Sequence, residues 1–367
     1  MLWLIALLAL AVLLWGVTRL YLDGEDLSRF DAQDDDEPAH TEPSPEHHQA
    51  VEAIRSMQAE AKGGWSSGRG LAQLRERVDE MGAVDDPTIR YDAADADGVA
   101  GEWVRAPGAD ADRRLLYIHG GAYMVGSHRS HRPITTALAR LTGAAVLAVD
   151  YRLMPEHRRL DGIEDCRRAY AWIIDHGPEG PAPVQALFMA GDSAGGNLTL
   201  ATAAWARDAG KRRADAVVAL SPHTDACMAS PSLRENIETD HMLGPMFSAF
   251  ARIPRRLALW TTWWTNRMRP SDPRISPLRG DLSGLPPTLV HASRAEMLLD
   301  DARRWVNRAR AAGTDARLHT WHHQLHVWHI FEPTLPEARE ALADIADFIE
   351  AQAPREAGDP EPERARA

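Results

Sequence analysis

The 367-residue chain is poor in several residue types on which particular classes of protein depend. It has only two cysteines, Cys166 and Cys227, which excludes a disulfide framework and any cysteine-rich zinc module. Its 41 basic residues are outnumbered by 53 acidic ones, for a net charge of −12. This balance argues against nucleic acid as a partner, because phosphate binding requires a basic face. With 44% hydrophobic residues, the chain is long enough for one large α/β domain or two smaller ones.

The amino end is a long segment without charge. No charged residue occurs between residues 2 and 18, and after Arg19 the apolar run continues to Leu22. That length matches the roughly 20 residues that a helix needs to cross a bilayer. A cleaved signal peptide is the alternative, but no basic segment precedes the run and no small-x-small site ends it. We therefore predict a membrane anchor over residues 1–22. The basic residues follow the run, which favours a cytoplasmic folded domain.

Two further segments lack the apolar residues that a hydrophobic core requires. Residues 23–37 hold eight acidic residues and one arginine, and prolines follow at positions 38, 43 and 45. We expect residues 23–43 to be an acidic, disordered linker and residues 354–367 to be a disordered tail. The folded domain is accordingly predicted to extend over residues 44–353.

Within that domain, short apolar segments alternate with amphipathic ones. The predicted strands are 115–118, 145–149, 186–190, 216–220, 287–292 and 316–321. The predicted helices are 45–61, 71–81, 133–141, 162–175, 198–209, 299–312 and 337–351. This alternation predicts an α/β fold with a mostly parallel sheet and helices on both faces. The region from about 225 to 281 is rich in Trp, Met and Pro, interrupts the alternation and is predicted to be an insertion.

The strand at 186–190 leads into a G-x-S-x-G pattern centred on Ser193, and a helix follows it. A turn of this kind between a strand and a helix holds the serine in a strained backbone conformation. It exposes the hydroxyl at the carboxyl edge of the sheet. The pattern alone is weak, because glycine-rich turns often contain serine, but its position favours Ser193 as a nucleophile.

A second glycine-rich turn follows the strand at 115–118. Backbone amides of Gly120 and Gly121 can turn inward there, because neither residue has a side chain. A tetrahedral intermediate carries an oxyanion that needs such preorganised donors. We therefore predict an oxyanion hole formed by Gly120, Gly121 and the amide of Ala194.

A nucleophilic serine needs a base, and the base needs a carboxylate that orients it. With a nucleophile of this type, the chain order is serine, acid, histidine. Glu296 follows the strand at 287–292 and is the candidate acid. Four histidines occur between residues 322 and 329, after the last strand. Pairs of them could instead share a metal ion, but no cysteine or carboxylate completes a ligand set before Glu332, so no metal is predicted.

Together, these motifs resemble those of the hormone-sensitive-lipase group (family IV) of bacterial esterases, which have the α/β-hydrolase fold. The resemblance covers about residues 45–350, in order and at family-like spacing. The matching segments are 117–123, 150–157, 191–198, 221–225, 276–278, 284–287, 296–301 and 326–328.

The resemblance implies an esterase that hydrolyses short to medium acyl esters without a cofactor. In it, Ser193 is the nucleophile, His326 the base and Glu296 the orienting acid. It also implies a helical cap formed by residues 44–82 and about 225–281. An amide or formamide hydrolase with the same triad, and a non-catalytic receptor on the same fold, are the alternatives.

The chain departs from the family pattern in its predicted membrane anchor, which the family usually lacks, in its acid and in one loop. The acid of the family is more often aspartate, and the loop before its histidine usually carries proline and glycine, where this chain has residues 322–325. The sequence leaves open whether Trp260, Trp263 and Trp264 line the acyl pocket or pack as core. The natural substrate and the oligomeric state are also left open.

Overall fold

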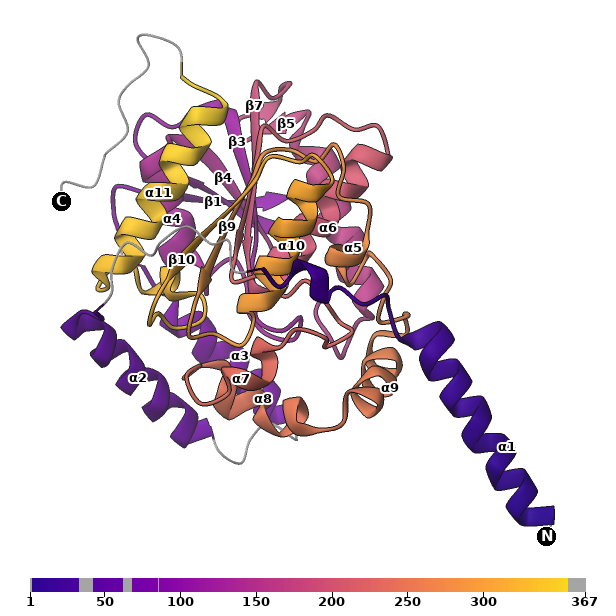
Figure 1. The fold of residues 1–367 in the computed structure, drawn as a ribbon. Helices are drawn as coiled ribbons and strands as arrows, with labels where there is room; N and C mark the ends of the chain where they lie inside the picture. The colour runs from indigo at the N-terminus through magenta and orange to yellow at the C-terminus, as the bar shows by residue number, and fades with distance from the viewer. Residues whose placement is uncertain (1, 33–41, 62–67, 85, 356–367) are drawn as a thin grey trace.

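The computed structural model describes residues 2–32, 42–61, 68–84 and 86–355 (Figure 1). Its centre is an eight-stranded sheet in the order β1-β2-β4-β3-β7-β8-β9-β10. The strands are β1 (Arg90–Asp95), β2 (Ala100–Arg105), β3 (Asp110–Ile118), β4 (Ala144–Val149), β7 (Ala186–Asp192), β8 (Ala216–Leu220), β9 (Thr288–Ser293) and β10 (Ala316–Trp321). The β1–β2 and β2–β4 pairings are antiparallel, and those from β4 to β10 are parallel. This confirms the predicted sheet. A separate hairpin joins β5 (His176–Gly177) to β6 (Gly180–Pro181).

Helices cover both faces of the sheet, as the alternation of segments predicts (Figure 1). One face packs against α4 (Arg132–Thr142) and α11 (Pro336–Gln352), the other against α5 (Arg159–Ile173), α6 (Ser193–Asp208) and α10 (Leu299–Ala311). Strand β3 contributes to both cores, because successive side chains of a strand point to opposite faces. Leu115 and Tyr117 lie in the α4–α11 core, and Leu116 and Ile118 in the other.

Strands β1 and β2 were not predicted from the sequence. The β1 strand lies at the edge of the sheet, and its side chains are half-buried or exposed, so it lacks the apolar alternation that predicts a strand. Asp92 pairs there with Arg90 and with Arg105 of β2. Charged side chains of this kind protect an edge strand from pairing with another chain.

The remaining helices lie together beyond the carboxyl ends of the parallel strands, below the sheet in Figure 1. They are α2 (Pro45–Ala61), α3 (Gly68–Met81), α7 (Ser232–Glu235), α8 (Leu243–Arg252) and α9 (Arg255–Asn266). Ser44 caps α2, since its hydroxyl accepts a hydrogen bond from the His47 amide (3.1 Å). The two segments expected to form a cap, residues 44–82 and about 225–281, thus both contribute helices at this edge of the sheet.

The amino end forms a helix that leaves the body of the protein (Figure 1). Helix α1 (Leu2–Val17) continues into a π-helical turn, η1 (Thr18–Leu22). The span Trp3–Leu22 is long and apolar enough to cross a membrane, by length and composition, and little of it is buried. An exposed apolar helix is therefore present where the sequence predicts an anchor.

The segment after this helix differs from the disordered linker that we expected over residues 23–43. Residues 23–32 lie along α10 and include a short 3-10 helix, η2 (Ser28–Phe30). Leu27 is buried in the main core, Asp31 pairs with Arg304, and the Asn307 side-chain amide donates to the Phe30 carbonyl oxygen (3.0 Å). Asp31 and Glu25 thus have basic partners on α10, Arg304 and Arg308. Residues 33–41 of the expected linker and 356–367 of the expected tail lie outside the described residues.

Candidate active site

The strand β7 runs directly into Ser193, which is the first residue of α6. The helix begins five residues before its predicted start at 198. Ser193 has a φ of +51°, a conformation that non-glycine residues rarely adopt. Gly195 lies so close to β3 that a Cβ atom there would be 2.0 Å from the Ile118 carbonyl oxygen. The turn therefore has the strained, tightly packed geometry expected of a nucleophile.

The structure brings together the three residues expected to form a triad. His326, in the loop after β10, has its Nε2 atom 2.8 Å from the Ser193 hydroxyl oxygen. Its Nδ1 atom lies 2.7 Å from Oε2 of Glu296, in the loop after β9. A carboxylate only accepts hydrogen bonds, so Nδ1 carries the proton and Nε2 is left to accept one from Ser193.

Both His326 and Glu296 are buried. Burial alone lowers the pKa of His326, but its hydrogen bond with Glu296 and the charge of that carboxylate outweigh burial. The pKa of His326 is therefore raised above the ordinary value of 6.5. The imidazole consequently keeps its second proton to a higher pH than a solvated histidine does.

The loop that carries Glu296 is held by residues that the sequence analysis missed. The side-chain amide of Asn236 donates to the carbonyl oxygens of Arg294 (3.0 Å) and Glu296 (2.9 Å). The Asp240 carboxylate accepts from the Met297 amide (2.8 Å). Asn236 and Asp240 belong to the insertion at 225–281, so the insertion fixes the position of the acid. No local pattern could have identified a contact across about 60 residues of chain.

The structure corrects the prediction that the amide of Gly120 belongs to the oxyanion hole. That amide donates to Oδ1 of Asp192 (3.0 Å), so it is already engaged. Residue 120 must be glycine for another reason, because a Cβ atom there would lie 2.1 Å from Oδ2 of Asp192. The amides of Gly121 and Ala122 donate to no described residue, and both residues have positive φ. With Ala194, in the first turn of α6, they form the set of available donors.

Asp192 connects the serine turn to the glycine turn. Its buried carboxylate accepts hydrogen bonds from the Tyr117 hydroxyl (2.7 Å), the Gly120 amide (3.0 Å) and Nε2 of His131 (3.2 Å). Burial alone would raise the pKa of Asp192, but the charge of His131 and these hydrogen bonds lower it. Asp192 therefore stays ionised and fixes the two turns relative to each other. The sequence analysis assigned it no role.

The histidines after β10 do not form the metal site considered in the sequence analysis. His326 faces Ser193, and His329 is buried with its Nε2 atom 3.1 Å from Nδ1 of His291. Among the described residues, the group with metal-like geometry is His291, His319 and Asp344, whose ligand atoms lie within 4.8 Å of one another. Asp344 accepts hydrogen bonds from both rings, at 2.9 and 2.7 Å, which account for this arrangement without a metal.

The tryptophans of α9 pack mainly at the junction with the amino-terminal helix. Trp260 and Trp263 lie against the cluster that contains Leu22 and Leu259, and the Trp260 indole donates to the Thr18 hydroxyl (2.9 Å). Trp264 is exposed. The sequence left open whether these tryptophans line the acyl pocket or pack as core. In the structure, Trp260 and Trp263 pack near η1, and Trp264 lies on the surface.

Known proteins resemble this chain in sequence and in fold. A family model described as alpha/beta hydrolase fold matches residues 115–330. An acetyl-hydrolase of Streptomyces hygroscopicus is 37% identical over 248 residues, which cover 68% of this chain and 78% of the relative. An esterase of Acinetobacter venetianus is 34% identical over 277 residues, covering 75% and 87% of the two chains. The crystal structure of an esterase from the bacterial hormone-sensitive lipase family is 35% identical, with a TM-score of 0.72, and covers 85% of this chain and 99% of that one.

These similarities, together with the sheet and the serine turn, define the class of protein as an α/β hydrolase. Within that class, the chain belongs to the hormone-sensitive-lipase-like esterases and is a carboxylesterase.

Proposed function

We propose that the protein hydrolyses short to medium acyl esters through a Ser193–His326–Glu296 triad and an acyl-enzyme. The observation that carries the proposal is the chain of two hydrogen bonds from Ser193 through His326 to Glu296, at 2.8 and 2.7 Å. Such a chain lets an imidazole take the serine proton while a carboxylate stabilises the imidazolium that forms.

In the first half-reaction, the Ser193 oxygen attacks the ester carbonyl carbon, and its proton passes to Nε2 of His326. The carbonyl oxygen becomes an oxyanion that accepts hydrogen bonds from the amides of Gly121, Ala122 and Ala194. The intermediate collapses when the bond to the alcohol oxygen breaks, and His326 gives its proton to that oxygen.

In the second half-reaction, water takes the place of the alcohol. His326 removes a proton from the water as its oxygen attacks the acyl carbon. The same amides bind the second oxyanion, and the proton then returns to the Ser193 oxygen as the carboxylic acid leaves. Neither half-reaction requires a cofactor.

The first prediction concerns pH. Only neutral imidazole can accept the serine proton, so kcat/KM should rise with pH as His326 loses its second proton. Because Glu296 raises the pKa of His326, the midpoint should lie above 6.5, the value for a solvated histidine. The measurement is kcat/KM for a soluble ester between about pH 5 and pH 9. A profile that is flat across that range would contradict a histidine base.

The second prediction concerns acyl chain length. The acetyl-hydrolase relative acts, by its name, on a short acyl group. We propose that helices from residues 44–82 and 225–281 cap the site and limit its size. The kcat/KM of p-nitrophenyl esters should fall at least about tenfold between butyryl and palmitoyl chains. Faster hydrolysis of an emulsified long-chain triglyceride than of a butyryl ester would contradict this substrate range.

We also propose that α1 anchors the enzyme in a membrane. The exposed span Trp3–Leu22 supports this assignment, because a helix with apolar residues on all sides needs an apolar surrounding. The basic residues that follow α1 favour a cytoplasmic esterase domain.

A further inference from the structure

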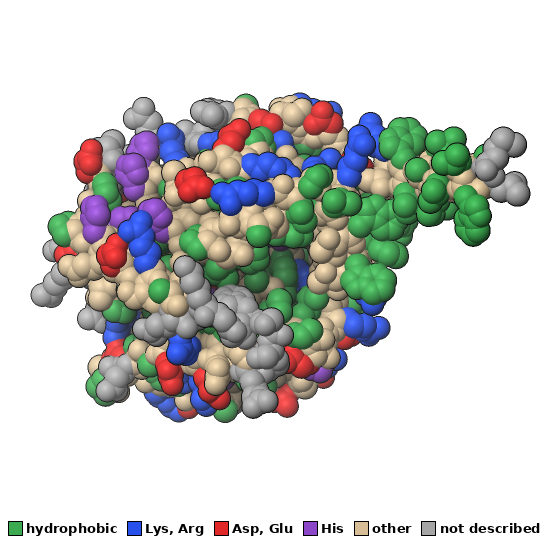
Figure 2. Space-filling model, turned by 90° about the horizontal axis from the view of Figure 1, so that it is seen from below, with side chains coloured by type: hydrophobic (Ala, Val, Ile, Leu, Met, Phe, Trp, Pro, Cys, Tyr) green, Lys and Arg blue, Asp and Glu red, His purple; other side chains and the backbone are tan. Residues whose placement is uncertain are grey.

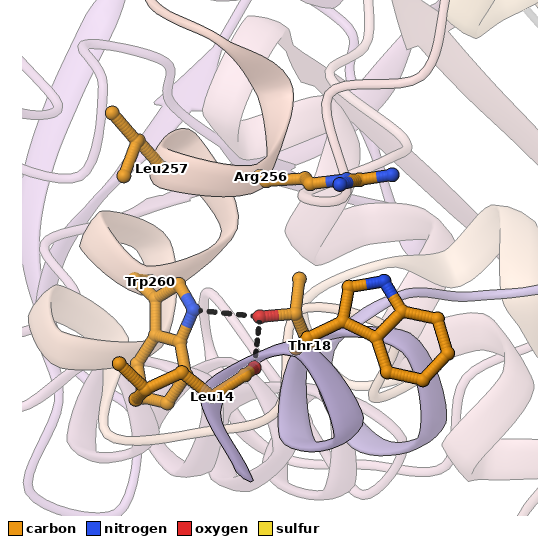
Figure 3. A pocket seen from close by; sticks show the side chains of 6 residues that line it. Leu14, Thr18, Arg256, Leu257 and Trp260 are labelled. Carbon is orange, nitrogen blue, oxygen red and sulfur yellow. Dashed lines mark hydrogen bonds between the residues drawn. The ribbon is translucent and has the colours of Figure 1, made fainter. Parts of the chain in front are cut away.

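The amino-terminal helix is fixed to α9 by its last turn. Leu22 is buried in a cluster with Leu259. The Trp260 indole donates to the Thr18 hydroxyl (2.9 Å), and that hydroxyl donates to the Leu14 carbonyl oxygen (2.7 Å), as Figure 3 shows. One residue beyond the turn, Asp23 pairs with Arg255 at the start of α9. Packing, a hydrogen bond and an ion pair thus fix the direction of α1 relative to α9.

The outer face of α9 carries large exposed apolar side chains. Leu257 is 58% exposed and Trp264 is 63% exposed, whereas Ala258 and Leu259 are buried. Positions 257, 260 and 264 follow the spacing that places side chains on one side of a helix. Figure 2 shows hydrophobic side chains continuing from the projecting helix onto the body of the protein. We refer to Arg256, Leu257, Trp260 and Trp264 as the α9 face.

An open pocket of about 390 Å³ lies at the junction of α9 and the end of α1. Figure 3 shows Leu257 and the Arg256 guanidinium above this space, and Leu14, Thr18 and Trp260 below it. Acyl chains match such an apolar lining, and a guanidinium matches lipid phosphate because its donors fit phosphate oxygens.

Arginine and aromatic side chains also gather around the α9 face. The guanidinium of Arg267 lies 4.1 Å from the ring centre of Trp264, and that of Arg269 lies 5.9 Å from the ring centre of Tyr21. Tryptophan, tyrosine and arginine are the residues that settle at the level of lipid headgroups. A bilayer is the occupant that fits, because the α9 face is continuous with a helix of membrane-spanning length.

We propose that the α9 face is a membrane-binding surface, which lies in the headgroup layer beside α1 with Arg256 against lipid phosphates. This inference rests on the proposed anchor. It adds that α9, and not α1 alone, contacts the bilayer.

The test uses the full chain in vesicles of phosphatidylcholine and phosphatidylglycerol, with an environment-sensitive fluorophore on single introduced cysteines. Both native cysteines, Cys166 and Cys227, are buried, so the label goes to the new thiol. The test positions are Leu257→Cys and Trp264→Cys, and the matched control is Glu179→Cys. Glu179 has a side chain that is 77% exposed and lies on the β5–β6 hairpin.

Labels at 257 and 264 should be quenched by lipids with a nitroxide near the headgroup and protected from aqueous iodide. The label at 179 should be quenched only by iodide.

A label at Leu8→Cys, within α1, separates this inference from the anchor. If iodide quenches positions 257 and 264 as freely as 179, while lipid nitroxides near the chain ends quench position 8, the anchor stands and the α9 face is overturned. If iodide reaches position 8 as well, both are overturned. Hydrolysis of a soluble ester by each labelled variant tests the esterase function separately.

The role of Arg256 has its own test. One basic residue at an anionic surface changes binding about fivefold. For the label at 257, the ratio of docked to undocked protein should rise when phosphatidylglycerol is added to phosphatidylcholine. Arg256→Gln should reduce that rise about fivefold, and Arg90→Gln, at the exposed sheet edge, should leave it unchanged. An unchanged response in Arg256→Gln overturns the phosphate contact.

Discussion

Ser193→Ala should lower kcat for ester hydrolysis by about 10⁶-fold, as loss of the serine does in a serine protease. The reason is that alanine has no oxygen to attack the carbonyl carbon, so no acyl-enzyme can form. The fold should be retained, because the substitution removes one oxygen and keeps the Cβ atom, so the strain at the positive φ of residue 193 is unchanged. The measurement is kcat on p-nitrophenyl butyrate, with the unfolding midpoint in urea as the test of folding.

An organophosphate provides the control for this prediction. It should label the wild type at Ser193 and should fail to label Ser193→Ala. Ser283→Ala removes a hydroxyl from a surface loop and should be labelled as fully as the wild type. Label at another serine, or turnover within tenfold of the wild type in Ser193→Ala, would show that Ser193 is not the nucleophile.

Glu296→Gln should lower kcat by about 10⁴-fold, the loss caused by the equivalent change in a serine protease. In this chain the cause can be traced to one backbone amide. Oε1 of Glu296 accepts a hydrogen bond from the Ser293 amide (2.9 Å), so a glutamine must place its oxygen there. Its NH₂ group then faces Nδ1 of His326, which has to accept rather than donate. The proton moves to Nε2, and the base can no longer take the proton of Ser193.

Two further measurements make this second prediction specific. The residual activity of Glu296→Gln should show a lower pH midpoint than the wild type, because the charge that raises the pKa of His326 is gone. Asp300→Asn is the matched control. Asp300 does not contact His326, and it accepts from the Ser232 amide (2.8 Å) and pairs with Arg303. That variant should lose about 1–3 kcal/mol of unfolding free energy and keep most of its kcat. A large loss of kcat in Asp300→Asn together with a small loss in Glu296→Gln would show that Glu296 is not the acid.

The control also illustrates where sequence reasoning was too simple. The position of Asp300 and Asp301 in the first turn of α10 predicts by itself only that they complement the helix dipole. In the structure both are buried, and Asp301 accepts from the amides of Thr224 (2.7 Å) and Asp225 (3.0 Å). They join α10 to the chain after β8. Such partners depend on the tertiary fold, and no local pattern predicts them.

Local patterns did predict most of the sheet and its helices. The predicted strands at 216–220 and 316–321 have the bounds of β8 and β10, because buried strands need short apolar or alternating runs. The start of α6 was placed too late, since Gly195 and Gly196 disfavour a helix by propensity, and packing against β3 overrides that preference.

In the candidate active site, too, some features follow from local sequence and others depend on the tertiary fold. The order of serine, acid and histidine along the chain predicted where the three groups meet, and the family resemblance selected His326 among the four histidines after the last strand. The direction of the Gly120 amide was not predictable, because it depends on the position of Asp192 after folding. Asn236 and Asp240 were not predictable either, since they hold the Glu296 loop from a segment far along the chain.

The packing of residues 23–32 against the body of the protein determines how the esterase domain is oriented relative to α1. If residues 23–43 were a flexible linker, its two ends would lie about 25 Å apart on average, and the domain could change its position and orientation relative to α1. Leu22, Leu27 and Asp31 are instead fixed to the body of the protein. Their contacts hold α1 in one direction relative to the esterase domain. With α1 anchored as proposed, the height of Ser193 above the membrane is set by packing and not by linker length. An enzyme held in this way would search for its esters in the plane of one surface, with the same side always facing them.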